Sequence, residues 1–257
     1  MPLREHLVEL RTRMLRSSIA VLVGAVAGWF LYTPLYEALQ QPLLDVAEEN
    51  NIAANLNFTE LMGAFNLQLK LSVYLGVLVA SPVWLYQLWA FVVPGLTRRE
   101  RRYAMTFAGA AVPMFVAGVG LAWLVLPNAV GFFTDFVPQG SSIFTSAEVY
   151  FGFATRLMLV FGLAFVLPLF LVALNLVGVL GAKTLVKGWR IAVVLIFLFA
   201  AIASPSPEVG SMIALALPMV ALYLAAMGIA VLNDRRRARR AREEGFADLQ
   251  DDEASPL

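Results

Sequence analysis

Residues 98–126 read RRERRYAMTFAGAAVPMFVAGVGLAWLVL, a basic cluster that passes directly into a long apolar run. Similar clusters recur along the chain, and they hold all but Lys70 and Arg156 of its 19 Lys and Arg residues. The clusters are Arg4/Arg11/Arg13/Arg16, Arg98/Arg99/Arg101/Arg102, Lys183/Lys187/Arg190 and Arg235/Arg236/Arg237/Arg239/Arg240/Arg242. Basic loops resist translocation across a membrane. The pattern therefore predicts a membrane-spanning protein with every cluster on the cytoplasmic side.

The composition supports the same class. Of the 257 residues, 60% are hydrophobic and only 14% are charged, and the mean hydropathy is +0.76. A soluble domain carries about 25% charged residues. There is no cysteine and a single histidine, His6, which excludes disulfides and a Cys/His metal site. We expect no metal and no cofactor.

The apolar runs predict an all-α integral membrane protein with six transmembrane helices and both termini in the cytoplasm. The predicted spans are 17–35, 65–93, 103–126, 150–180, 189–203 and 211–232. Residues 1–16 are expected to form an amphipathic helix on the cytoplasmic surface, because Leu3, Leu7, Leu10 and Met14 recur at helical spacing. The charged tail, 233–257, is expected to be disordered.

Two features of the spans suggest their shape. Prolines should bend four of the helices and so favour a cupped molecule; they are Pro82, Pro113, Pro168 and Pro218. The span 189–203 is short, roughly 22 Å at 1.5 Å per residue, against a hydrocarbon core of ~30 Å. Gly109, Gly118 and Gly120 are interpreted as points of close helix packing rather than as a phosphate-binding loop.

The residues argue against several functions. No Asp or Glu lies deep within a predicted span, whereas ion pumps and proton-coupled carriers place carboxylates there. Paired aspartates, a Ser/His pair and a metal set for intramembrane proteolysis are also missing, so we do not expect an enzyme. A small-solute transporter or channel is the alternative class, but the spans offer few polar residues to line a pathway, unless a pore forms between subunits. A structural scaffold is a third reading.

Two carboxylates at the predicted cytoplasmic ends are candidate binding groups. Glu9 lies one helical turn before Arg13, a spacing that favours an ion pair, and Glu100 lies among four arginines. Each could simply be a counter-ion on a solvated helix face. Alternatively, Glu9 and Glu100 present carboxylates to an arginine-bearing cytoplasmic peptide, because a carboxylate is the natural bidentate partner of a guanidinium.

These residues lie in segments that resemble the TatC family, the multi-spanning core of the twin-arginine protein translocase. The resemblance covers about residues 3–240, and the end Asn233-Asp-Arg-Arg-Arg237 looks like actinobacterial members. The segments that carry it are HLVELRTR (6–13), ASPVWLYQLWAFVVPGL (80–96) with RERR (99–102), FGLAFVLP (161–168), and SPSPE (204–208) followed by ALP (216–218).

The resemblance implies a cup-shaped, six-helix receptor in the bacterial plasma membrane. It implies binding of twin-arginine signal peptides of folded precursors, transport driven by the proton-motive force, and oligomeric assembly with TatA and, where the complex contains one, TatB. Signal-peptide binding is assigned by the resemblance to Glu9, Glu100, Arg11, Phe91 and Pro42. Contact with partner subunits is assigned to Ser204, Pro205, Pro207, Glu208, Met212 and Pro218.

The chain departs from the family pattern inside the membrane. Val166 stands where many members have a glutamate, and Met212 and Leu224 replace polar groups of the last span. The intramembrane polar residues that remain are Gln87, Gln68, Asn66 and Asn175, for which hydrogen bonding between helices is the favoured reading. Lys70 and Arg156 are expected to snorkel to the outer interface or to pair with Glu60 or Glu148. The cluster 235–242 is assigned to topology and anionic lipid rather than to nucleic acid.

Overall fold

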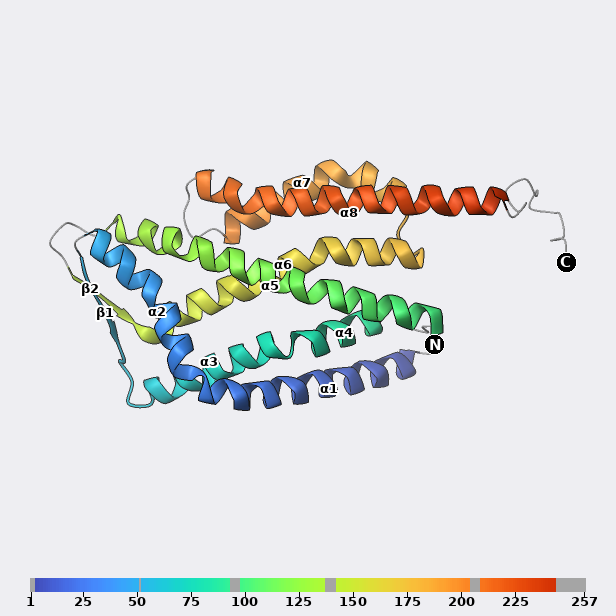
Figure 1. Cartoon of the computed structure of the whole chain (residues 1–257). Coiled ribbons are helices and arrows are strands. Elements are labelled where there is room, and N and C mark those ends of the chain that lie inside the picture. Colours follow the sequence, from blue (N-terminus) through green and yellow to red (C-terminus); the bar gives the residue numbers. More distant parts are fainter. Residues whose placement is uncertain (1–2, 51, 93–97, 137–141, 204–208, 244–257) are drawn as a thin grey trace.

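The computed structural model describes residues 3–50, 52–92, 98–136, 142–203 and 209–243. In these ranges the elements are α1 (Leu3–Phe30), α2 (Tyr32–Glu49), β1 (Ala53–Asn57), α3 (Gly63–Val79), α4 (Ser81–Val92), α5 (Arg98–Thr134), β2 (Ser142–Ser146), α6 (Ala147–Val177), α7 (Ala182–Ala203) and α8 (Val209–Glu243). The long helices lie side by side, and β1 and β2 form a small parallel pair at one end of the bundle (Figure 1).

The described helices supply six membrane crossings. α1, α5, α6, α7 and α8 are each long and apolar enough to span a membrane, and α3 with α4 makes a sixth crossing as a bent pair. The prediction of an all-α, six-span protein is thus confirmed. The two halves of the pair meet at 62° around Ala80, next to Pro82, which has no N–H to continue the helix. The indole N–H of Trp84 donates to the Val77 carbonyl oxygen across this break, at 2.9 Å.

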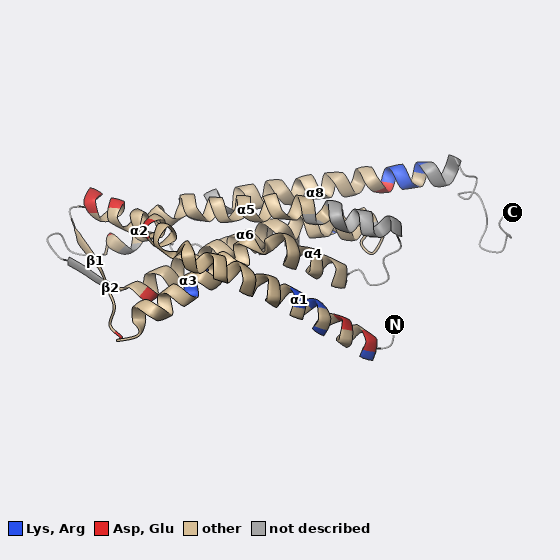
Figure 2. Ribbon diagram, turned by 60° about the horizontal axis from the view of Figure 1, so that its bottom comes forward, with Lys and Arg blue, Asp and Glu red and all other residues tan. Residues whose placement is uncertain are grey.

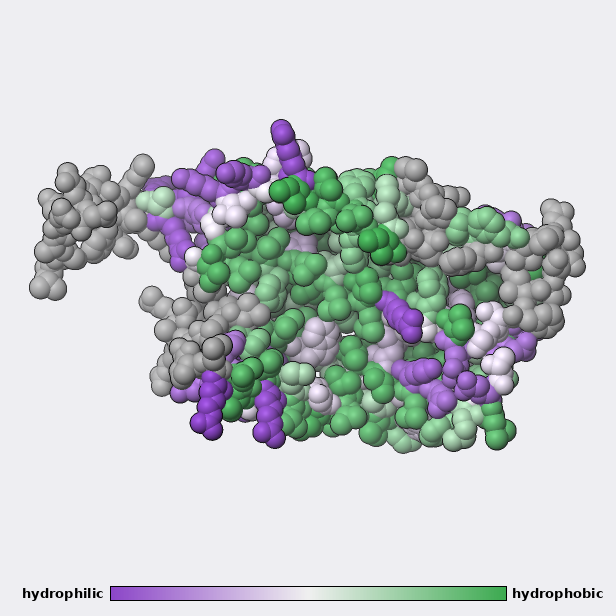
Figure 3. All heavy atoms as spheres, turned by 180° about the vertical axis from the view of Figure 1, so that it is seen from behind, coloured by the Kyte–Doolittle hydropathy of each residue, from purple (hydrophilic) through white to green (hydrophobic). Residues whose placement is uncertain are grey.

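The two ends of the bundle differ in charge. The start of α1 and the end of α8 lie at one end, and α2 reaches the other end beside β1 and β2 (Figure 1). Lys and Arg gather at the first end, whereas Asp and Glu mark the second (Figure 2). We call these the basic end, marked by residues 4–16 and 235–239, and the acidic end, marked by residues 37–49. A broad apolar surface lies between them (Figure 3).

Close helix packing depends on glycine at a few positions. α5 packs along α6 and α1 along α3. A Cβ on Gly118 would lie 2.5 Å from the Phe161 carbonyl oxygen, and one on Gly76 would lie 2.5 Å from that of Val21. The expected close packing is therefore confirmed at Gly118. It is wrong at Gly109 and Gly120, where an added Cβ would meet no described atom within 4 Å.

Residues 36–64, which lie between the first two predicted spans, contain most of α2. Leu39, Leu43, Val46 and Ala47 are buried and recur at helical spacing, and α2 packs on α5. The Tyr150 hydroxyl of α6 donates to the Leu39 carbonyl oxygen at 2.8 Å and so holds α2 in place. The acidic end is thus closed by a packed helix rather than by an irregular loop.

Helix boundaries also differ from the predicted spans. α1 is one continuous helix that joins the expected surface helix to the first span, and it ends at Phe30 shortly before Pro34, which cannot donate a helical hydrogen bond. α7 begins at Ala182 rather than at 189, because its lysines are good helix formers. Disorder was the wrong expectation for 233–243, which continue α8. Residues 244–257 lie outside the described ranges.

Candidate functional site

A polar bridge links α1 to α4 at the basic end. Arg13 Nε donates to Glu9 Oε1 at 2.9 Å, one turn away on α1, and Arg13 Nη1 donates to Gln87 Oε1 of α4 at 3.2 Å. The Glu9 side chain is 24% exposed and that of Arg13 is 20% exposed, so water screens the pair only in part. Within the described part of the chain, Glu9 Oε2 has no partner. The expected Glu9–Arg13 pair is therefore present, and one carboxylate oxygen remains free to accept another hydrogen bond.

An aromatic contact fixes the first turns of α1 against the end of α4. The rings of His6 and Phe91 stack with centroids 4.5 Å apart and planes 16° from parallel. This contact lies one turn from Glu9, so Phe91 joins the neighbourhood of the carboxylate. Stacked rings at such a separation contribute about 0.5–1.5 kcal/mol beyond their buried area.

A groove of about 240 Å³ runs between these two helices. We call it the α1–α4 groove; its lining residues are Leu10, Arg13, Met14, Ser17, Ser18, Trp84, Gln87, Leu88 and Phe91. The walls are mostly apolar, and Arg13 and Gln87 stand beside them as the strongly polar groups. The groove therefore suits an apolar peptide segment that carries a charged group at the basic end.

Of the five residues assigned to signal binding, the structure brings Glu9 and Phe91 together. Glu100 lies in the first turn of α5, at the basic end, but its side chain is outside the described ones. Arg11 is exposed on α1 and does not line the groove. Pro42 is buried inside α2, toward the acidic end and away from Glu9 (Figure 1).

The predicted partner-contact residues are described only in part. Ser204, Pro205, Pro207 and Glu208 lie outside the described residues. Met212 is half-buried and packs against the largest core cluster, which contains Ala200 of α7 and Ala216 of α8. Pro218 lies inside α8, which continues through it.

The intramembrane polar residues divide into two groups. Asn175 Nδ2 donates to Asp234 Oδ1 and to the Leu180 carbonyl oxygen, both at 2.9 Å, and Asp234 Oδ2 accepts from the Ala182 N–H at 2.7 Å. Asn175 thus joins the end of α6 to α8 and to the start of α7, and the predicted hydrogen bonding between helices is confirmed for it and for Gln87. Gln68 and Asn66 are half-buried, and their side chains bond no other described residue.

Val166 shows how the chain fills the position where many relatives have a glutamate. Its side chain is only 5% exposed and packs in a cluster with Trp89, Phe107 and Phe115. Burying an ionised carboxylate in an apolar environment of this kind would cost a large desolvation free energy. The departure from the family pattern is therefore matched by its surroundings, whereas Leu224 remains exposed on α8.

Sequence reasoning missed two members of the site, Arg13 and His6. The spacing of Glu9 and Arg13 predicted the pair, but it did not show that Arg13 would also reach Gln87, 74 residues away. His6 was considered only as a metal ligand. The signal for its true contact was weak, because a stack between two helices depends on their register.

Comparisons with known proteins agree on one family. Residues 5–218 match the family model described as Sec-independent protein translocase protein (TatC). The chain is similar to the TatC protein of Xylanimonas cellulosilytica, 52% identical over 93% of this chain and 87% of that protein, and to that of Frankia casuarinae, 41% identical over 100% and 73%.

The fold gives the same result. A crystal structure titled as the twin arginine translocase receptor TatC in DDM superposes with a TM-score of 0.71 at 28% identity, covering 88% of this chain and 99% of that one. A second crystal structure of the receptor superposes with a TM-score of 0.68. Membership of this family makes the chain a translocase component rather than an enzyme and sets aside the solute-transporter alternative. The chain belongs to the TatC family of Sec-independent protein translocase proteins and is a multi-pass membrane component of the Tat translocase.

Proposed function

We propose that the basic end of this protein receives the twin-arginine signal peptides of folded precursors and starts their transport across the plasma membrane. The observation that carries this proposal is the Glu9 carboxylate, which is partly buried, bonds Arg13 of the α1–α4 groove through Oε1 and has no described partner at Oε2. The solved relatives are titled as twin-arginine receptors, which supports the choice of ligand.

In this proposal, one arginine of the signal peptide pairs with Glu9. Its guanidinium donates a hydrogen bond to Glu9 Oε2, while Arg13 continues to donate to Oε1. The hydrogen bond from Arg13 to Gln87 holds Arg13 in place. Hydrogen bonds to charged groups contribute about 1.5–3 kcal/mol each. A lysine in the ligand would bind less well, because it lacks the planar fork that matches a carboxylate.

The second arginine pairs with Glu100. Residue 100 lies in the first turn of α5 at the basic end, and α5 packs on α4, the helix that carries Gln87 and Phe91. The apolar stretch of the signal then follows the α1–α4 groove toward Trp84. Arg11 and Pro42 do not share this groove, so we assign neither a direct contact with the twin arginines.

The proposed topology places the basic end in the cytoplasm. Basic segments resist translocation, and the start of α1 and the end of α8 share this end (Figure 2). Both described helix ends would then face the cytoplasm of the bacterial cell, and the cap formed by α2, β1 and β2 would face outward.

The later steps involve partners. We propose that TatA, and TatB where the complex contains one, dock near α7 and α8 around residues 204–218 in an oligomeric complex driven by the proton-motive force. The apolar part of α7 after Arg190 is short, roughly 20 Å at 1.5 Å per residue. A short apolar stretch thins the bilayer locally, which would assist transport. Normal transport after insertion of one apolar turn into α7 would contradict this role.

Peptide binding to the full chain in lipid nanodiscs tests the proposal. A fluorescent signal peptide with Arg-Arg should bind the Glu9→Gln variant about 10- to 100-fold more weakly than the unaltered chain. Glu5→Gln is the matched control, because Glu5 is exposed in the first turn of α1 and, unlike Glu9, bonds no described residue of the groove. Equal affinity for all three chains would contradict the role of Glu9.

A further inference from the structure

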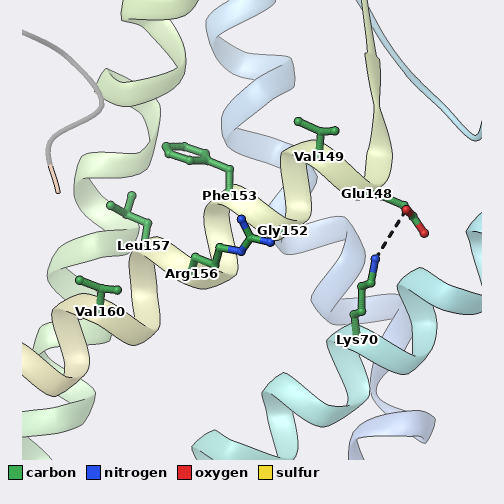
Figure 4. A pocket seen from close by; sticks show the side chains of 8 residues that line it. All are labelled: Lys70, Glu148, Val149, Gly152, Phe153, Arg156, Leu157 and Val160. Atoms are coloured by element: carbon green, nitrogen blue, oxygen red, sulfur yellow. Dashed lines mark ion pairs between the residues drawn. The ribbon is translucent and has the colours of Figure 1, made fainter. Parts of the chain in front are cut away.

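A second groove lies in the half of the bundle near the acidic end, where it brings together the two cations that belong to no basic cluster. It holds about 470 Å³ between α3 and α6. Lys70 comes from α3, and the other lining residues are Glu148, Val149, Gly152, Phe153, Arg156, Leu157 and Val160 of α6 (Figure 4). We call it the α3–α6 groove.

The charges of this groove do not balance. Lys70 Nζ lies 3.5 Å from Glu148 Oε2, so of the alternatives left open for Lys70 the pair with Glu148 is present. Arg156 is exposed, and it makes no ion pair with any described residue. One positive charge is therefore left over on a surface that is otherwise apolar. An unpaired guanidinium at membrane depth is costly and points to a function.

The direction of Arg156 shows where its partner should lie. Arg156 follows the start of α6 by roughly 13 Å along the helix axis at 1.5 Å per residue. Its side chain extends past Gly152 toward the turn that carries Glu148 (Figure 4). Arginine in a membrane extends in this way toward the head-group region. Its preferred ligand is therefore an anion of the leaflet at the acidic end.

We propose that the α3–α6 groove binds the head group of an anionic phospholipid. A phosphodiester carries one negative charge, which balances the surplus charge of the groove, and it would lie between Arg156 and Lys70. Phosphatidylglycerol is a lipid of this kind, with a net charge of −1 on its phosphodiester. One acyl chain then follows the apolar wall formed by Leu157 and Val160.

An acidic side chain from a partner helix fits less well. A carboxylate would also meet the charge requirement. Phosphodiesters are already present at the depth toward which Arg156 extends, whereas a partner carboxylate would have to be desolvated to reach it. Lipid is therefore the favoured occupant.

Photolabelling of the full chain in phosphatidylcholine nanodiscs tests this site. The probe is a phosphatidylglycerol with a photoactivatable acyl chain, and labelled peptides are mapped by mass spectrometry. Label should appear in residues 149–160. Lys70→Gln and Arg156→Gln should each reduce it about fivefold, and the double variant by about 20-fold, since each cation near a surface attracts anionic lipid with roughly that strength.

Matched controls separate the site from general charge. Lys183→Gln with Lys187→Gln removes two cations from the opposite, basic end and should leave the label in 149–160 unchanged. Arg156→Lys should retain most of it. A choline-headed probe, whose head group carries no net charge, should label the unaltered chain about fivefold less, and this comparison needs no variant.

Three outcomes would overturn the proposal. The first is equal labelling of the unaltered chain and the double variant, or equal labelling of the unaltered chain by the phosphatidylglycerol probe and the choline-headed probe. The second is loss of label on addition of inorganic phosphate, which would mean that the groove binds the free anion. The third is a crosslinker at Val160 that captures a protein subunit in native membranes instead of lipid, which would assign the groove to a partner helix.

Discussion

The α1–α4 groove and the α3–α6 groove are each built around an ion pair, but the pairs leave different groups unsatisfied. Glu9 and Arg13 lie on one helix and balance each other, and the unused group is a carboxylate oxygen. Lys70 and Glu148 lie on two helices, and Arg156 adds a cation with no described partner. The first groove can therefore accept a guanidinium, whereas the second requires an anion. The comparison shows that an ion pair by itself does not define a ligand; the group left unsatisfied beside it does.

The largest expected effect removes both proposed carboxylates of the basic end. Glu9→Gln combined with Glu100→Gln should weaken binding of an Arg-Arg peptide by roughly 100-fold or more, because two charge-assisted contacts are lost. Titration of the peptide into nanodiscs measures this change. Lipid labelling of residues 149–160 should stay as it was. A parallel loss of lipid labelling would mean that the variant had lost its fold rather than one ligand.

The reciprocal change has a smaller effect. Lys70→Gln combined with Arg156→Gln should reduce lipid labelling about 20-fold and leave the Kd of the Arg-Arg peptide within about twofold. Measurement of both quantities on one preparation checks the independence of the grooves. If peptide binding fell together with lipid labelling, the two grooves would not be independent. A conformational change shared by both grooves would then be required to explain the coupling.

A neutral change within the first groove should have a modest effect. Gln87→Leu removes the acceptor that holds Arg13 Nη1 from α4 but leaves the Glu9–Arg13 pair on α1 intact. The loss of one hydrogen bond to a charged group should weaken peptide binding about threefold to tenfold. Gln68→Leu on α3 is a control of the same chemistry, since the Gln68 side chain bonds no other described residue. Identical Kd values for both variants would show that Gln87 does not position Arg13.

The sequence predicted the six spans, the basic end and the Glu9–Arg13 pair, because hydropathy, charge clusters and helical spacing are local properties, whereas it left the partner of Lys70 open. It did not predict α2, since Glu37, Asp45, Glu48 and Glu49 made the segment look like a polar loop although its buried face has helical spacing. The reach of Arg13 to Gln87 and the stack of His6 on Phe91 depend on the register between helices. A linear pattern carries no such register. Pro42 was grouped with Glu9 by the family resemblance alone, and the fold places it on a different helix, α2.

Crosslinking from inside each groove tests the central claim most directly. Photoreactive residues replace Leu88 in the α1–α4 groove or Val149 in the α3–α6 groove, both exposed positions. Precursors carry Arg-Arg or Lys-Lys, and the chain carries Glu9 or Glu9→Gln. The account predicts a crosslink from Leu88 that requires both the twin arginines and Glu9, and none from Val149. Equal crosslinking from Leu88 for all four combinations would reduce Glu9 to a counter-ion of Arg13 and contradict the proposed receptor site.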